Sequence, residues 1–131
     1  MKTNASEFYA ITRTDRDHLD ALLPIYQEFL VYYHDRYGHL LRGIALEENQ
    51  ILEYLRTQCD TDQSVIFFAT LKATPQLPAG FLMMSRGCPA GKHRTTWAIK
   101  NLFVTPAQRG KGIASRLVGE ALDYCPVSYT H

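Results

Sequence analysis

The apolar segment Ser64–Leu71, with the sequence SVIFFATL, restricts the fold of this chain more than any other feature. It has the length of a strand, and its apolar residues do not alternate with polar ones. This pattern is typical of a central strand buried on both faces, so the sheet that contains it needs cover on both sides. Residues 7–13, 79–85 and 95–104 are three further predicted strands.

Helical spacing of apolar residues accounts for most of the remaining chain. It predicts helices over residues 14–37, 45–59 and 110–125, with Thr14 as the first N-cap and Pro126 after the last helix. The predicted order is β-α-α-β-β-β-α, and the short connections between the later strands favour an antiparallel meander. At 131 residues one domain is expected. We therefore predict an α/β fold, with a mixed, mainly antiparallel sheet and flanking helices on both faces.

Composition and charge exclude several classes of function. The formal net charge is +1, so neither nucleic acid nor a membrane surface is expected as a partner. The sequence has no run of about 18 apolar residues and no apolar signal-peptide core, and we expect a cytoplasmic protein. Cys59, Cys88 and Cys125 are odd in number and far apart, as is typical of free thiols in a reducing compartment. The histidines lack ligand spacing, so no metal is expected.

The feature that carries chemistry is the segment 102–114, LFVTPAQRGKGIA, in which a strand runs into a glycine-rich turn that opens a helix. The first N–H groups of a helix lack partners within the helix, and together with the helix dipole they bind anions. Gly110 and Gly112 carry no Cβ, so a phosphate can approach their backbone closely. Arg109 and Lys111 add positive charge. The segment therefore predicts a pyrophosphate site. The alternative is a tight strand-to-helix turn whose basic side chains face solvent.

This segment resembles the signature of the GNAT acetyltransferases, Q/R-x-x-G-x-G/A after a strand that ends in L-x-V. Arg109, Gly112 and Ala114 match the turn, and Leu102 and Val104 match the strand. In that family the turn binds the pyrophosphate of acetyl-CoA, and the strand offers backbone groups to the pantetheine arm and the acetyl carbonyl. The resemblance, which extends to the element order over residues 7–125, implies that nine residues bind this cofactor: Leu102, Phe103, Val104, Arg109, Gly110, Lys111, Gly112, Ile113 and Ala114.

Candidates for binding the acceptor amine are Tyr32, Tyr33, Tyr37 and Asn101. Tyr33 and Tyr37 match the Y-x-x-x-Y-G helix end of a GNAT subgroup that resembles this chain and acts on small amines. Both also lie on the apolar stripe of their helix, so a place in the core is the alternative, whereas Tyr32 lies off that stripe. The subgroup has an acidic residue where Asn101 stands, and an amide cannot act as a general base. Glu28 is interpreted as a solvated charge on the helix face. No catalytic acid or base follows from the sequence.

The last residues depart from the family pattern. GNAT chains continue past this helix with a strand, another helix and further strands, whereas here residues 127–131 follow Pro126. We therefore expect a single domain, residues 1–131, that lacks its C-terminal strands and helix. It would be a truncated product, a fragment, or a chain that completes itself as a homodimer.

Two functional hypotheses follow from the resemblance. The first is transfer of the acetyl group of acetyl-CoA to a primary amine of a small molecule or peptide. The second is a catalytically incomplete acyl-CoA-binding or partner-dependent domain, which the short C-terminus favours. A nucleic-acid-binding module is disfavoured, because the basic residues are few and no aromatic platform accompanies them.

Overall fold

A single antiparallel sheet organises the computed structural model, which describes residues 8–14, 16–37, 47–59, 63–74, 77–87 and 96–125. The sheet has the order β1-β2-β3-β4, and each strand pairs antiparallel with the next one along the chain. The predicted meander is therefore confirmed. The strands are β1 (Tyr9–Arg13), β2 (Ser64–Leu71), β3 (Pro78–Gly87) and β4 (Thr96–Val104).

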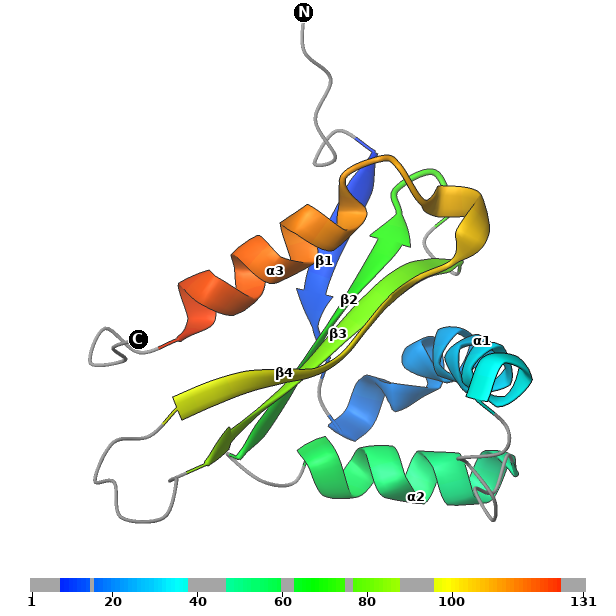
Figure 1. The fold of residues 1–131 in the computed structure, drawn as a ribbon, viewed down its shortest axis with the longest axis vertical. Coiled ribbons are helices and arrows are strands. Elements are labelled where there is room, and N and C mark those ends of the chain that lie inside the picture. Colours follow the sequence, from blue (N-terminus) through cyan, green and yellow to red (C-terminus); the bar gives the residue numbers. More distant parts are fainter. Residues whose placement is uncertain are drawn as a thin grey trace, which may run out of the picture.

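Helices cover both faces of the sheet, as the apolar β2 sequence requires (Figure 1). Helices α1 (Leu19–Tyr37) and α2 (Glu48–Cys59) pack on one face, and α3 (Ile113–Tyr124) packs on the other. Short 3-10 turns precede α1 and follow β4, namely η2 (Arg16–His18) and η4 (Pro106–Gln108). No helix in these described parts is long and apolar enough to cross a membrane.

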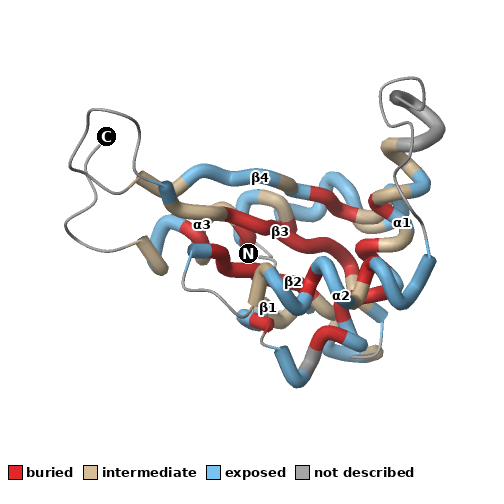
Figure 2. Tube along the Cα trace, turned by 90° about the horizontal axis from the view of Figure 1, so that it is seen from below, coloured by how far each residue is buried: buried red, intermediate tan, exposed pale blue. Residues whose placement is uncertain are grey.

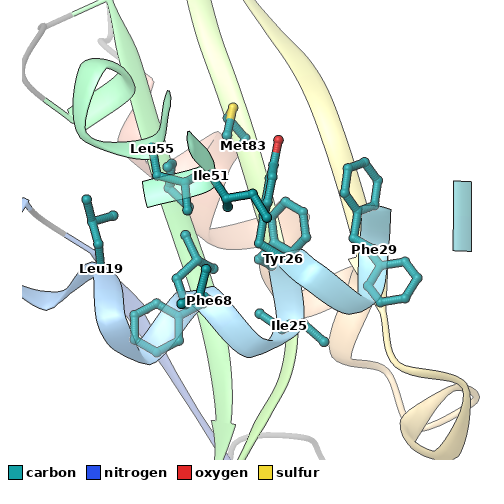
Figure 3. Packing of buried hydrophobic residues seen from close by; sticks show 13 residues of the cluster. Leu19, Ile25, Tyr26, Phe29, Ile51, Leu55, Phe68 and Met83 are labelled. Carbon is teal, nitrogen blue, oxygen red and sulfur yellow. The ribbon is translucent and has the colours of Figure 1, made fainter. Parts of the chain in front are cut away.

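The two faces of β2 lie in two separate apolar clusters. Ile66 and Phe68 belong to the cluster under α1 and α2, and Val65 and Phe67 belong to the cluster under α3. Successive side chains of a strand point to opposite faces, which explains why the run does not alternate in polarity. Figure 2 shows the resulting buried stripe through β2 and β3. Figure 3 shows how the first cluster packs, with these labelled members: Leu19, Ile25, Tyr26, Phe29, Ile51, Leu55, Phe68 and Met83.

A β-bulge in β4 reverses which side chains face each layer. Asn101 and Ile99 pair with consecutive residues of β3, so Lys100 is left without a partner in the sheet. Phe103 packs in the cluster under α1, whereas Trp97 packs against the cluster under α3. Strict alternation would put these two residues on the same face, since an even number of positions separates them. The bulge therefore allows both aromatic residues to be covered by a helix.

Element boundaries differ from the predictions in four elements. The first helix, predicted over residues 14–37, opens as the 3-10 turn η2, and its α-helical part begins at Leu19. The last helix, predicted to begin at Gly110, begins at Ile113, because Gly110 and Gly112 adopt positive φ values of 80° and 83°. A right-handed helix cannot pass through that conformation. The second helix begins at Glu48, and residues 45–46 lie outside the described parts of the chain. Strand β3 extends to Gly87, since its last residues still pair with β4.

Candidate functional site

A cleft of about 530 Å³ opens between α1, the end of β4 and the glycine turn. The sheet supplies one wall, the aromatic side of α1 supplies another, and the first residues of α3 close the third side. The lining residues are Tyr32, Tyr33, Leu102, Phe103, Val104, Gln108, Arg109, Gly110, Gly112, Ile113, Ala114 and Ser115.

The structure brings most of the predicted site residues together in this cleft. Every candidate cofactor residue except Lys111 contributes to the lining, and so do Tyr32 and Tyr33. Lys111 is exposed on the turn beside it. Asn101 is absent from the lining, and its Nδ2 lies 4.0 Å from the Sδ atom of Met83. The side chain of Tyr37 lies outside the described residues.

The glycine turn presents backbone atoms to open space. At Gly110 and at Gly112, no atom lies within 4 Å of the position that a Cβ would occupy. Gly112 is the N-cap of α3, and its carbonyl accepts the N–H of Arg116 at 3.1 Å. The N–H groups of the first turn of α3 have no such helical partner and border the cleft through Ile113 to Ser115. An open concavity of this kind, at the positive end of a helix, fits a phosphate group.

The side chain of Arg109 is exposed, but it folds back over the cleft that it lines. Its Nε donates a hydrogen bond to the carbonyl oxygen of Val104 at 2.8 Å. Its guanidinium carbon lies 5.2 Å from the ring centre of Tyr32 and 5.5 Å from that of Phe103. These distances are within the range of cation–π attraction. Arg109 therefore ties α1 to the end of β4, in addition to carrying charge.

The end of β4 directs the backbone of Val104 away from β3. The N–H of Thr105 donates to the carbonyl of Ala79 at 2.9 Å, and backbone groups alternate in direction along an antiparallel strand. The N–H and carbonyl of Val104 therefore face the open side of the sheet. A Cβ on Gly80 would lie 2.7 Å from the carbonyl oxygen of Phe103, so only glycine permits the two strands to approach here.

Three side-chain hydrogen bonds of the turn were not foreseen from the sequence. The hydroxyl of Thr105 donates to the carboxylate of Glu28, which the sequence pattern had assigned to a solvated helix face. The side-chain oxygen of Gln108 accepts from the hydroxyl of Tyr9 at 2.8 Å and from Nζ of Lys111 at 3.1 Å. Glu28 and Tyr9 come from distant parts of the chain, so no local sequence pattern indicates their contacts with the turn.

Ionisable groups near the cleft are few. Among the described lining residues there is no aspartate, glutamate or histidine. Tyr26 lies deeper, and burial, reinforced by the neighbouring Tyr54, raises its pKa well above the ordinary value. Burial also raises the pKa of the Cys125 thiol, which disfavours the nucleophilic thiolate. The described residues contain no group of three potential metal ligands.

Solved structures with similar folds include several acetyltransferases. A probable acetyltransferase superposes with a TM-score of 0.68 at 20% identity, covering 87% of this chain and 69% of that one. An aminoglycoside acetyltransferase from an uncultured soil metagenomic sample, in complex with sisomicin, gives 0.65 at 15% identity, with 91% and 70% covered. An aminoglycoside N-acetyltransferase in complex with CoA gives 0.65 at 16% identity, with 88% and 68% covered.

These likenesses concern the fold, and the sequence itself identifies the family. No curated protein sequence matches the chain significantly. The sequence model of the acetyltransferase (GNAT) family matches residues 13–127, which include strands β2 to β4, helices α1 to α3 and the glycine turn. The chain therefore belongs to the GNAT acetyltransferase family.

Proposed function

We propose that this protein transfers the acetyl group of acetyl-CoA to a primary amine of a small molecule. The observation that carries the proposal is the cleft, in which the outward-facing end of β4 meets an open glycine turn at the start of α3. A helix N-terminus suits the pyrophosphate of the cofactor, and an apolar strand suits its pantetheine arm. The aminoglycoside acetyltransferases among the structural neighbours support a small-molecule acceptor, although a peptide amine has the same chemistry.

In this proposal, different residues of the cleft bind different parts of the cofactor. Gly110, Gly112 and the first N–H groups of α3 would hold the pyrophosphate, with Lys111 adding charge at the rim. Leu102 and Val104 would lie along the pantetheine arm. Acetyl-CoA supplies an activated acetyl thioester when it is bound. The N–H of Val104, which points away from β3, is suited to polarise the thioester carbonyl.

The acceptor must be a neutral amine when it attacks, because an ammonium group has no lone pair. The described lining contains no carboxylate or imidazole that would remove the proton. We therefore propose that the proton leaves through water, and that Tyr32 and Tyr33 form the acceptor side of the cleft. On this basis the pH profile of kcat/KM should follow the pKa of the acceptor amine itself.

The test uses the purified chain, acetyl-CoA and a panel of amines with different pKa values. We expect release of free CoA thiol that depends on the amine, with an apparent pKa of kcat/KM that shifts from one amine to the next. One common apparent pKa for all amines would show that a protein group acts as the base. Binding of CoA without turnover of any amine would support the catalytically incomplete domain instead.

Self-association through β4 is also part of the proposal. Within the described residues β4 has a partner on only one edge, and its Ile99 and Leu102 side chains are 48% and 38% exposed. An exposed apolar edge strand tends to pair with another chain. We propose a homodimer that covers this edge and completes the cleft.

A further inference from the structure

The glycine turn is attached to the sheet by a tyrosine from the far edge strand. Tyr9 is the first residue of β1 and is only 5% exposed. Its hydroxyl donates to the side-chain oxygen of Gln108 at 2.8 Å, across 99 positions of sequence. Figure 1 shows why this is possible, since the connection from β4 to α3 crosses the end of the sheet at which β1 begins.

The same oxygen of Gln108 also holds Lys111. Nζ of Lys111 donates to it at 3.1 Å, so both lone pairs of the amide oxygen have donors. Lys111 is otherwise an exposed side chain with many accessible rotamers. The bond to Gln108 keeps its ammonium group next to the two glycines, where the helix N-terminus already favours an anion.

The other hydrogen bonds of the turn are local. Gln108 and Arg109 donate their N–H groups to residues three positions earlier, and the side chain of Arg109 bonds to β4. Among the described residues, the Tyr9 bond is the only hydrogen bond that joins residues 106–112 to an element outside β4 and α3. The two glycines in this stretch allow its backbone to adopt other conformations. The hydrogen bond from Tyr9 therefore favours the conformation that the turn has in the structure.

We propose that Tyr9 is a positioning residue for the cofactor, which acts through Gln108 to hold the turn and Lys111 ready for the pyrophosphate. This inference rests on the proposed function. The ring of Tyr9 packs with Ile113 and Leu117 under α3, a task that phenylalanine would perform as well. The hydroxyl is therefore the group that sets the turn.

Tyr9→Phe isolates the hydroxyl, because it keeps the packed ring. We expect its dissociation constant for CoA, measured by calorimetry, to rise about threefold to tenfold, the range for one net hydrogen bond. In steady-state kinetics KM for acetyl-CoA should rise, while kcat and KM for the amine stay unchanged. Tyr124→Phe is the matched control. Tyr124 is the last residue of α3, and its ring packs against Phe67 and Trp97 of the sheet. No hydrogen bond of its hydroxyl occurs among the described residues.

A double-mutant cycle with Gln108→Leu decides whether the effect passes through Gln108. The double variant should bind CoA no more weakly than Gln108→Leu alone. Independent, multiplying effects would overturn the inference, as would a Tyr9→Phe variant that binds CoA like the unmodified protein. In both cases the proposed function would stand. If the unmodified protein itself fails to bind CoA, the proposed function and the inference fall together.

Discussion

Gly112 combines two demands at one residue: a left-handed backbone and free space for a ligand. Its φ of 83° is unfavourable for any residue with a Cβ, by about 1–2 kcal/mol. The space beside it is open, so a larger side chain would meet no protein atom. Such a side chain would instead occupy the volume in which we place the phosphate.

Gly112→Glu should therefore lower the free energy of unfolding by about 1–2 kcal/mol and abolish CoA binding. Gly119→Glu makes the same change within α3, where the backbone is helical and space is also open. That control should keep CoA affinity and gain up to about 0.5–1 kcal/mol of stability, because glycine is a poor helix former. Urea unfolding and CoA titration of both variants provide the measurement. Equal CoA affinity in the two variants would remove the turn from the cofactor site.

Arg109 contributes shape as well as charge, and its substitutions should separate the two. Arg109→Ala should weaken CoA binding by about 1 kcal/mol. Arg109→Lys keeps the charge but loses the hydrogen bond to Val104 and the planar contact with Tyr32, so it should recover only part of that loss.

Lys111 offers the contrast within the same turn. Lys111→Ala should also cost about 1 kcal/mol at low salt, and its effect should fade as salt rises. The effect of Arg109→Lys should depend little on salt, since the charge is unchanged. Titrations at two ionic strengths distinguish these expectations. Full recovery by Arg109→Lys would show that only the charge matters.

The bulge of β4 is the element whose removal tests the architecture. Deleting Lys100 would restore regular alternation and leave Trp97 and Ile99 on their present faces, because Ile99 and Asn101 already pair with consecutive residues of β3. Trp97 would then keep its edge-to-face contact with Tyr124, whose ring centre is 5.7 Å away. We therefore expect the free energy of unfolding in urea to fall by no more than about 1 kcal/mol. A loss of about 3 kcal/mol or more, comparable to removal of a large core side chain, would contradict this register of β4. Lys100→Ala keeps the bulge and should change stability by less than about 0.5 kcal/mol.

This bulge also marks the limit of prediction from sequence. The continuous apolar run of β2 and the spacing of the helices predicted every strand and α-helix in order, because burial leaves a periodic pattern. Residue 100 is a lysine, so no glycine or proline at this position indicates a β-bulge. The register of β4 depends on which helix covers Trp97 and Phe103, and that information is not local.

The functional site was also predictable only in part, because some of its residues leave a local sequence signal and others do not. A left-handed turn needs glycine, so Gly110 and Gly112 were visible in the sequence. The anchor between Tyr9 and Gln108 was not, because each residue alone is ordinary. Asn101, a candidate from the family resemblance, contacts Met83 and does not line the cleft.

At the scale of the molecule, the exposed flank of β4 is the surface through which we propose that two copies of the protein associate. Figure 2 shows a run of exposed residues in the middle of this strand, in contrast to the buried β2 and β3. We expect light scattering to give a dimer whose fraction rises with protein concentration.

Charges placed on the β4 flank should disfavour association. Ile99→Lys and Leu102→Lys should therefore shift the protein toward monomer. Leu122→Lys is the control, because Leu122 is 60% exposed but lies on α3. A protein that remains monomeric at every concentration, and still turns over amines rapidly, would contradict the proposed dimer. It would also show that one copy of residues 1–131 is sufficient to form the active site.

The meander has a consequence for how the molecule is made. Each strand pairs with its neighbour along the chain, so the sheet can form in the order of synthesis, although β1 finds its partner only after α1 and α2 have been made. The bond from Tyr9 to Gln108 is different, because it closes a loop of 99 positions. The strand that anchors the turn leaves the ribosome long before the turn exists. The cofactor site is therefore assembled after the sheet that supports it.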